Sequence, residues 1–225
     1  PRYPSGLEKM MGLKSPQVIS YAGNIGLLKQ STVGFCGSRK ASEQGLSVAR
    51  DCAMQAAELG IVVVSGNAAG VDVATHYHAL VNGGSTILVL PEGIENFRVR
   101  KVLQSVWDWN RVLVISQFEP QHIWQAYRAM ARNKVIIGLS GAMIVIEAGD
   151  RGGTLNAGKS TLEMGLPLFV AQYEEMSSDA NGNEILLEMG GVPLNKLRST
   201  NRANMSKVMN ALNFPNLARV QPKLI

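Results

Sequence analysis

The stretch TVGFCGSRKAS, residues 32–42, places a short apolar run directly before a glycine-containing turn. The run Val33–Cys36 predicts a strand that is buried on both faces. The turn Gly37–Arg39 leads at once into a helical segment, which Ser42 can cap. Backbone N–H groups of such a turn, the positive end of the helix and the guanidinium of Arg39 together favour bound phosphate. A plain turn that simply requires glycine is the alternative interpretation.

The same pattern of strand and helix continues along the chain. Five more apolar, β-branched runs predict strands, at Ile61–Val64, Thr86–Leu90, Val112–Ile115, Ala142–Ile146 and Leu168–Ala171. Amphipathic segments between and after them predict helices, at Ser42–Leu59, Val71–Val81, Val99–Trp109, Gln121–Val135, Leu155–Met164 and Glu184–Met189. This alternation predicts an α/β, extended Rossmann-like fold: a mostly parallel sheet of six or more strands with helices on both faces.

Residues 32–194 therefore form the expected main domain. Residues 1–31 are expected to be a lead-in segment that packs on it, with a short strand at Val18–Tyr21. Residues 195–225 are polar and rich in Asn, and are expected to form a packed arm, a helix or a tail.

The composition indicates a folded protein with an anionic partner. Of 225 residues, 46% are hydrophobic and 17% charged, which predicts a large core. The formal charge of +5 makes nucleic acid or nucleotide a plausible ligand without deciding between them. The two cysteines, Cys36 and Cys52, are expected to be buried and reduced, which together with the absence of a secretory signal or an apolar span favours a cytoplasmic protein. The chain starts at Pro1 rather than Met, which indicates a trimmed chain or a fragment. No Cys/His spacing predicts a metal site, and no cofactor is expected.

In parallel sheets ligands bind beyond the carboxyl ends of the strands, so the residues after each strand are informative. Small residues, Ser65-Gly66-Asn67-Ala68-Ala69-Gly70, follow the second strand and lead to Asp72 and His76. The last two are four apart on one helix face. They are either a catalytic pair or, as we prefer, a structural carboxylate and a hydrogen-bonded histidine.

Residues 153–160 satisfy the P-loop pattern G-x-x-x-x-G-K-[ST]. Six residues separate this glycine from the preceding strand, however, and no later strand ends in an Asp that could hold Mg²⁺. The segment from Thr154 reads better as a helix, with Lys159 on its surface. A P-loop NTPase remains a lesser alternative.

Aromatic and cationic residues occur together in the segment Trp124–Lys134. Stacking of bases on an aromatic ring while cations hold the backbone is how single strands are bound. The opposing interpretation is that Trp124 and Tyr127 belong to the core and that the cations are solvated.

An ordered series of motifs resembles the DprA/Smf family of bacterial DNA-processing proteins. The series includes Gly37-Ser38-Arg39…Ser42, Ser65-Gly66-x-Ala68-x-Gly70-Val71-Asp72-x-x-x-His76, Arg132-Asn133-Lys134-x-Ile136-x-Gly138-Leu139-Ser140, Glu147-Ala148, Gly153-Thr154-Leu155 and Gly182-Asn183. The order and spacing carry the resemblance, which covers residues 16–194.

The resemblance implies a single-stranded DNA-binding domain that usually dimerises and that loads RecA during natural transformation. It implies no catalytic residues, so the protein is not expected to be an enzyme. Carried over by position, the DNA- and phosphate-binding residues are Gly37, Ser38, Arg39, Ser42, Gly66, Arg132, Asn133, Lys134, Gly153 and Thr154.

The sequence also departs from the family pattern. Ala129-Met130 replaces the usual Phe-Pro, so Tyr127 and Trp124 are the candidates for base stacking. Gln172-Tyr173-Glu174-Glu175 replaces Pro-Gly and adds negative charge, and the helical and winged-helix domains of full-length members are absent. A divergent single-domain member is therefore expected. The alternative function is that of a nucleotide-binding Rossmann-like protein, either a sensor or an N-glycosidic hydrolase, although the loop that such hydrolases use is incomplete here.

Overall fold

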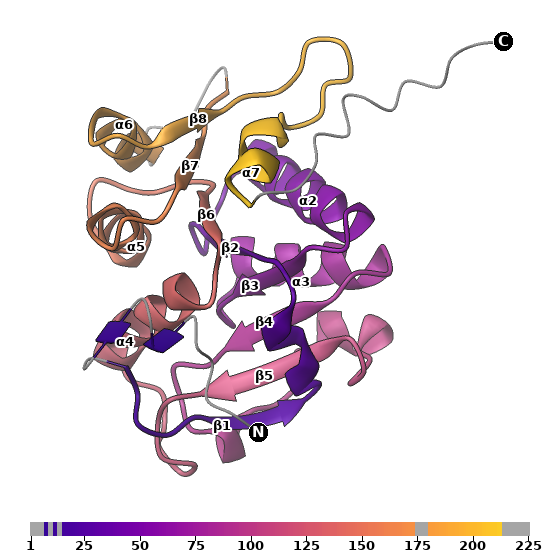
Figure 1. Ribbon diagram of the computed structural model, residues 1–225, viewed down its shortest axis with the longest axis vertical. Helices are drawn as coiled ribbons and strands as arrows, with labels where there is room; N and C mark the ends of the chain where they lie inside the picture. Colours follow the sequence, from indigo (N-terminus) through magenta and orange to yellow (C-terminus); the bar gives the residue numbers. More distant parts are fainter. Residues whose placement is uncertain (1–6, 9–10, 13–14, 174–179, 213–225) are drawn as a thin grey trace, which may run out of the picture.

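The computed structural model describes residues 7–8, 11–12, 15–173 and 180–212. An eight-stranded sheet, in the order β1-β5-β4-β3-β2-β6-β7-β8, runs through the centre of this part of the molecule (Figure 1). The strands are β1 (Ser20–Gly23), β2 (Thr32–Cys36), β3 (Val62–Ser65), β4 (Thr86–Val89), β5 (Val112–Ser116), β6 (Ala142–Val145), β7 (Leu168–Ala171) and β8 (Val192–Leu194). Every neighbouring pair is parallel except β1 with β5. The predicted fold class is confirmed, and each of the six predicted strands is present with bounds shifted by at most one residue.

Helices cover both faces of the sheet (Figure 1). On one face lie α2 (Glu43–Glu58), α3 (Val71–Val81) and α7 (Ser206–Ala211), with the short 3-10 helices η3 (Ile94–Asn96) and η4 (Lys101–Val106). On the other face lie α4 (Ala126–Gly138), α5 (Gly153–Glu163) and α6 (Asn181–Glu188), together with the 3-10 helix η2 (Ile25–Lys29). Strand β3 shows why the strands read as unbroken apolar runs: Val62 and Val64 enter one core cluster, and Val63 enters the other.

Helix α2 begins and ends as its sequence predicts. The Ser42 side chain accepts a hydrogen bond from the Gly45 N–H at 2.9 Å. Gly60 follows the last turn with φ +67°, the left-handed conformation that glycine adopts without strain. Cys36 and Cys52 are both buried and free, as expected.

Two predicted helices differ from the structure. Within the segment Val99–Trp109 only the 3-10 helix η4 forms, and Leu103 is its one fully buried side chain. The helix expected from Gln121 begins instead at Ala126. The carbonyl of His122 accepts from the Gly93 N–H and from Asn96, so the backbone there is committed to the loop after β4 rather than to a helical turn.

Segments outside residues 32–194 also join the fold. Strand β1 pairs antiparallel with β5, close to the short strand expected at Val18–Tyr21. Strand β8 was not predicted, because three residues that include Pro193 carry no periodic signal; an edge position tolerates the proline. Within residues 195–212, Val208 and Met209 of α7 are buried, and Arg202 binds Asp51 of α2 at 2.8 Å. This part of the C-terminal segment is thus a packed arm.

Candidate functional site

The turn after β2 lies at the point where the order of successive strands across the sheet changes direction. From β2 the chain proceeds to β3, β4 and β5 on one side, and it later returns to β6 on the other. Ligands of open α/β sheets bind at such a switch point. Two adjoining cavities lie there, as the sequence led us to expect.

The first, the β2–β6 cavity, has a volume of about 650 Å³. It is formed by the turn after β2, the first half of α4, the loop after β6 and the start of α5, and its lining includes Gly37, Ser38, Arg39, Lys40, Asp72, Trp124, Ala129, Met130, Arg132, Asn133, Glu147, Arg151, Gly153 and Thr154. Four cationic side chains therefore face two carboxylates. Seven of the ten predicted DNA-binding residues lie on this one surface: Gly37, Ser38, Arg39, Arg132, Asn133, Gly153 and Thr154.

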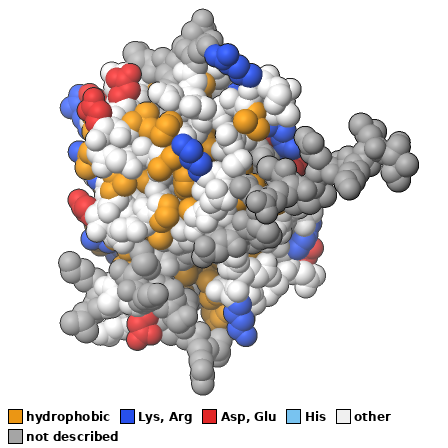
Figure 2. Space-filling view, turned by 45° about the horizontal axis from the view of Figure 1, so that its top comes forward, with side chains coloured by type: hydrophobic (Ala, Val, Ile, Leu, Met, Phe, Trp, Pro, Cys, Tyr) orange, Lys and Arg blue, Asp and Glu red, His pale blue; other side chains and the backbone are white. Residues whose placement is uncertain are grey.

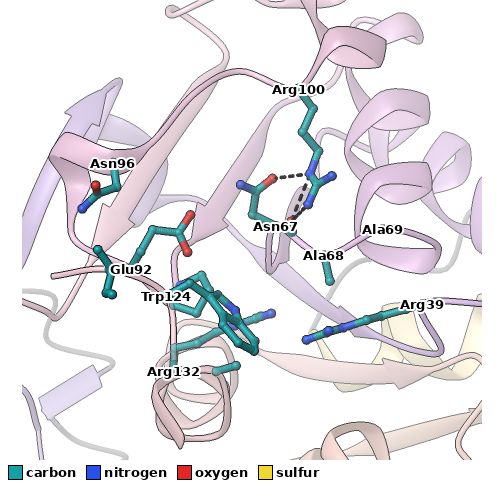
Figure 3. A pocket seen from close by; sticks show the side chains of 12 residues that line it. Arg39, Asn67, Ala68, Ala69, Glu92, Asn96, Arg100, Trp124 and Arg132 are labelled. Carbon is teal, nitrogen blue, oxygen red and sulfur yellow. Dashed lines mark hydrogen bonds between the residues drawn. The ribbon is translucent and has the colours of Figure 1, made fainter. Parts of the chain in front are cut away.

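The second, the β3–β4 cavity, has a volume of about 460 Å³ (Figure 3). It is formed by the loops that follow β3 and β4, and its inner lining includes Asn67, Glu92, Asn96 and Arg100. It shares Arg39, Ala68, Trp124, Ala129 and Arg132 with the first cavity. The two cavities are thus halves of one continuous site.

Close backbone contacts shape the turn after β2. A Cβ at position 37 would overlap Val71, and one at position 70 would overlap the Ser38 carbonyl. Both glycines are therefore required by space, and Gly70 also has φ +76°. Arg39 is exposed and lies over the Trp124 ring, with its Cζ atom 5.9 Å from the ring centroid. It is free to turn toward an anion.

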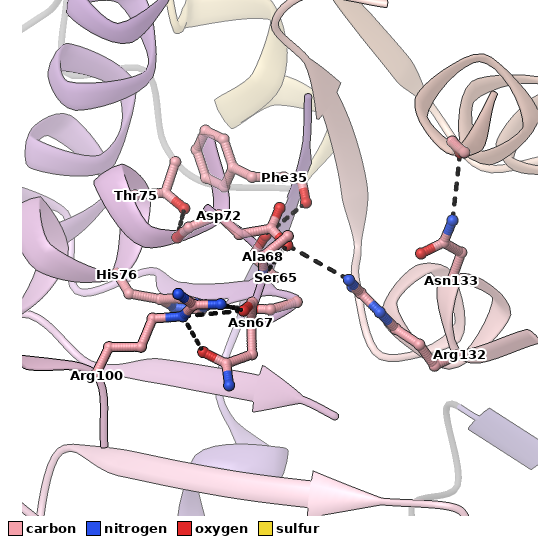
Figure 4. Close-up of polar contacts among 12 residues, drawn as sticks. Phe35, Ser65, Asn67, Ala68, Asp72, Thr75, His76, Arg100, Arg132 and Asn133 are labelled. Carbon is pink, nitrogen blue, oxygen red and sulfur yellow. Dashed lines mark hydrogen bonds and ion pairs between the residues drawn. The ribbon is translucent and has the colours of Figure 1, made fainter. Parts of the chain in front are cut away.

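Arg132 is the buried cation of the site (Figure 4). Its guanidinium lies 3.4 Å from Asp72, both side chains are more than nine-tenths buried, and its Nε has no hydrogen-bond partner. A Cβ at position 66 would overlap this guanidinium, so Gly66 leaves the space that Arg132 occupies. Gly66, which was expected among the DNA- and phosphate-binding residues, lines neither cavity and instead makes room for the Arg132 side chain.

The helix of Asp72 and His76 contains no catalytic pair. Asp72 accepts hydrogen bonds from Ser65 Oγ and the Ala68 N–H, at 3.0 and 3.1 Å, besides pairing with Arg132. The His76 ring contacts the Gly66 carbonyl and Thr86 Oγ1, and its burial lowers its pKa to about 4 (Figure 4). The catalytic interpretation is wrong, and both side chains instead hold the loop after β3.

Ser42 and Lys134 do not line either cavity. The Ser42 hydroxyl donates to Glu147 at 2.5 Å, and its N–H donates to the same carboxylate at 2.8 Å. Tyr173 also donates to Glu147. Burial, and to a lesser extent this hydrogen bond, raises the pKa of Tyr173. Lys134 is exposed in a separate groove between α4 and α5. The expectation that Ser42 and Lys134 share the phosphate site is therefore wrong. Glu174 and Glu175 lie outside the described residues.

The aromatic residues before and within α4 are exposed rather than part of the core. Trp124 is 49% exposed at the rim of both cavities, and Tyr127 is 63% exposed but lines neither. Arg128 is buried beneath Tyr127, and its guanidinium donates to the Ile123 carbonyl at 2.7 Å. The opposing interpretation is wrong for the two aromatic residues and for Arg128 and Arg132, which are buried, and right for the exposed Lys134. Trp124 is the stacking candidate that lines the cavities.

The P-loop pattern lies entirely within a helix. Residues 153–160 belong to α5, so its glycines form no phosphate loop, and Gly158 packs against Leu186 of α6. The N-terminus of α5 does face the β2–β6 cavity through Gly153 and Thr154, with no side-chain cap. Its role toward an anion is that of an ordinary helix N-terminus.

The predicted binding residues did not include several polar side chains of the lining: Asn67, Glu92, Asn96 and Arg100 of the β3–β4 cavity, and Lys40 and Arg151 of the β2–β6 cavity. Asn67 and Glu92 directly follow strands, so the rule about strand ends could have identified them. Asn96 and Arg100 lie further from the strand ends and carry no such signal. Arg100 is held at the site by its hydrogen bonds to Asn67. Among the described residues no group of His, Cys, Asp or Glu side chains could hold a metal ion. No helix in the described part of the chain is long and apolar enough to span a membrane.

With this geometry established, comparison with known proteins is informative. The family model of DNA recombination-mediator protein A matches residues 1–202. The chain belongs to this family. The chain is 35% identical to DNA processing protein DprA of Streptococcus pneumoniae over 178 residues. The aligned residues are 78% of this chain and 62% of that protein. The chain spans about 60% of the length of the curated relatives DprA of S. pneumoniae and DprA of Bacillus subtilis.

Solved structures of the DprA family agree with the fold. The crystal structure of S. pneumoniae DprA superposes with a TM-score of 0.76 at 32% identity, covering 85% of this chain and 67% of that one. DNA processing protein A of Helicobacter pylori, whose structure was described for its single-stranded DNA binding mode, gives a TM-score of 0.76 at 24% identity. That match covers 95% of this chain and 92% of the other. The resemblance seen in the sequence motifs is confirmed.

Proposed function

We propose that this protein binds single-stranded DNA at the two adjoining cavities and acts as a recombination mediator. The observation that carries the proposal is the position of Arg39, Trp124 and Arg132, which converge from the turn after β2 and from the region of α4 onto one surface (Figure 3). The family membership and the single-stranded DNA binding of the H. pylori protein support it.

The chemistry of the surface favours an unpaired strand. Arg39, Lys40, Arg132 and Arg151 can neutralise backbone phosphates, and the uncapped start of α5 adds backbone N–H donors. The exposed ring of Trp124 offers a stacking face, which only a base outside a duplex can reach. In the view of Figure 2, Lys and Arg side chains are scattered, and several lie beside Asp or Glu side chains.

The same surface favours binding over catalysis. Cys36 lines the β2–β6 cavity, but burial and the nearby Asp72 raise its pKa to about 12, so it is not a ready nucleophile. Glu147 is occupied by Ser42 and Tyr173, and His76 lines neither cavity. We therefore propose a non-enzymatic protein that needs no cofactor.

Fluorescence anisotropy with a labelled oligo-dT tests the proposal. We expect binding that weakens as salt rises, because bound phosphates release counterions. Arg39→Ala should weaken binding by roughly tenfold or more, the effect of losing one charged contact. Arg198→Ala, an exposed arginine that lines neither cavity, should bind like the wild type. Absence of oligonucleotide binding at low salt would contradict the proposal. Binding of free nucleoside monophosphates without binding of the oligonucleotide would favour a nucleotide binder instead.

The remaining parts of the proposal rest on the family resemblance. They are a RecA-type recombinase as partner, a homodimer in solution and a place in the cytoplasm. Stimulated assembly of a recombinase on oligonucleotides already coated with a single-strand-binding protein would support the first, and light scattering would test the second.

A further inference from the structure

The inner half of the β3–β4 cavity differs chemically from the rest of the site. Both cavities are lined by Arg39 and Arg132. The β3–β4 cavity adds Arg100, the carboxylate of Glu92 and the amides of Asn67 and Asn96 (Figure 3). Its volume of about 460 Å³ lies within the ~300–1,000 Å³ range typical of ligand sites. It opens beside Trp124, at the place where a stacked base would lie.

Glu92 forms no ion pair with any described residue, although Arg132 and Arg100 lie near enough to lower its pKa. Burial outweighs these cations and raises the pKa above that of an ordinary glutamate. A carboxylate repels phosphate. Asp72 of the β2–β6 cavity is paired with Arg132, and Glu147 accepts from Ser42 and Tyr173, whereas Glu92 has no ion-pair partner among the described residues and can accept from a different ligand group. N–H donors on the edge of a base are such groups.

The two amides beside Glu92 are fixed with known polarity. Asn67 Oδ1 accepts from Arg100 Nε at 3.0 Å, which leaves the Asn67 NH₂ group as a donor on the side toward Glu92 (Figure 3). Asn96 Nδ2 donates to the His122 carbonyl at 3.0 Å, which leaves Asn96 Oδ1 as an acceptor. Besides the guanidinium groups of Arg39, Arg100 and Arg132, the cavity thus presents one fixed amide donor, one carboxylate and one further acceptor.

Guanine matches this wall better than the other bases. Its Watson–Crick edge carries two adjacent N–H donors, N1–H and N2–H₂, which one carboxylate can accept together, and O6 beside them can accept from an amide. Thymine offers a single N–H flanked by two carbonyls that a carboxylate repels, while adenine and cytosine each offer only an exocyclic amine. We propose that the β3–β4 cavity binds a guanine of the single strand, with Glu92 as the selecting residue and Asn67 as the donor to O6. This proposal rests on the proposed single-stranded DNA binding.

The test compares oligonucleotides that differ at one base. Anisotropy titrations would use a dT 12-mer and the same oligomer with one central guanine, adenine, cytosine or hypoxanthine; a single guanine avoids quadruplexes. We expect the guanine oligomer to bind roughly tenfold tighter than oligo-dT, the discrimination of one good bidentate contact. With the wild-type protein, hypoxanthine, which lacks the 2-amino group, should show only part of this preference.

Glu92→Gln should abolish the guanine preference while keeping affinity for oligo-dT, because an amide cannot accept from both N–H groups. Glu95→Gln is the matched control: Glu95 lies three residues further on, is exposed and does not line the cavity. Equal binding of the guanine and thymine oligomers by the wild type would overturn the guanine site and leave single-strand binding intact. An equal gain of affinity for every oligomer in Glu92→Gln, with the preference kept, would also overturn it, because Glu92 would then merely repel phosphate. Failure to bind any oligomer would overturn both proposals.

Discussion

Arg132 combines two properties that seldom occur together. It is buried against Asp72, yet its Nε lacks a partner and its guanidinium lines both cavities. A buried cation with spare donors is costly unless a ligand completes its hydrogen bonds. Gly66 makes the arrangement sterically feasible, and Asp72 keeps the side chain in place. The central cation of the site is therefore built from three elements, α4, α3 and the loop after β3.

Gly66→Ala should weaken oligonucleotide binding by roughly tenfold, the worth of one charged hydrogen bond. The added methyl would overlap the Arg132 guanidinium and push it out of its position between Asp72 and the cavities. Anisotropy measures the affinity, and circular dichroism with thermal melting checks that the variant is folded. A folded Gly66→Ala variant that binds like the wild type would show that the position of Arg132 is unimportant.

His76 should make the protein less stable in acid. Its folded-state pKa of about 4 lies below the ordinary histidine value of 6.5, so the unfolded chain takes up a proton first as the pH falls. Stability is unaffected above pH 6.5 and declines between 6.5 and 4, by roughly 3 kcal/mol at about 1.4 kcal/mol per pH unit. Urea unfolding across this range measures the loss. In His76→Gln, whose amide can still donate to the Gly66 carbonyl, the decline should be smaller by this amount; equal slopes in both proteins would refute the assignment.

Among the elements, α5 shows how far a local pattern can mislead. Its eight-residue P-loop match is complete, but the pattern describes letters, whereas a phosphate loop needs a non-helical backbone directly after a strand. The six intervening residues and the helical character of the segment from Thr154 correctly favoured a helix. The start of α4 was placed too early, because the tertiary hydrogen bonds that hold His122 and Ile123 cannot be seen in a sequence. Lys134 was misplaced because residues two apart on a helix point about 200° apart, so it cannot share a surface with Arg132.

Lys159→Ala should leave oligonucleotide affinity unchanged, and neither the wild type nor this variant should hydrolyse ATP. Lys159 lies in the middle of α5, in the groove between α4 and α5 and outside both cavities. Parallel anisotropy and phosphate-release assays on the variant and the wild type would show this, with Arg39→Ala as the positive control for lost binding. ATP hydrolysis by the wild type that disappears in Lys159→Ala would restore the P-loop interpretation.

At the scale of the whole molecule, the order of strands and helices was enough to predict the fold and the edge at which the site lies. Parallel topology places the carboxyl ends of β3, β2 and β6 side by side, so the segments that follow these strands lie at one edge of the sheet although they are far apart in sequence. What topology does not specify is which side chains pair across that edge. Asp72 with Arg132 and Asn67 with Arg100 are contacts between residues 60 and 33 positions apart, set by packing of whole elements.

The most direct test of the DNA-binding surface is photocrosslinking to an oligonucleotide that contains 4-thiothymidine, followed by mass spectrometry of the peptides. We expect crosslinks to concentrate in Gly37–Lys40 and Trp124–Asn133, which contribute to the cavities at the carboxyl ends of the strands. Arg39→Ala should reduce them, and Arg198→Ala should not. Crosslinks confined to the basic segment Lys196–Lys207, with none at either of the expected segments, would contradict the proposed site.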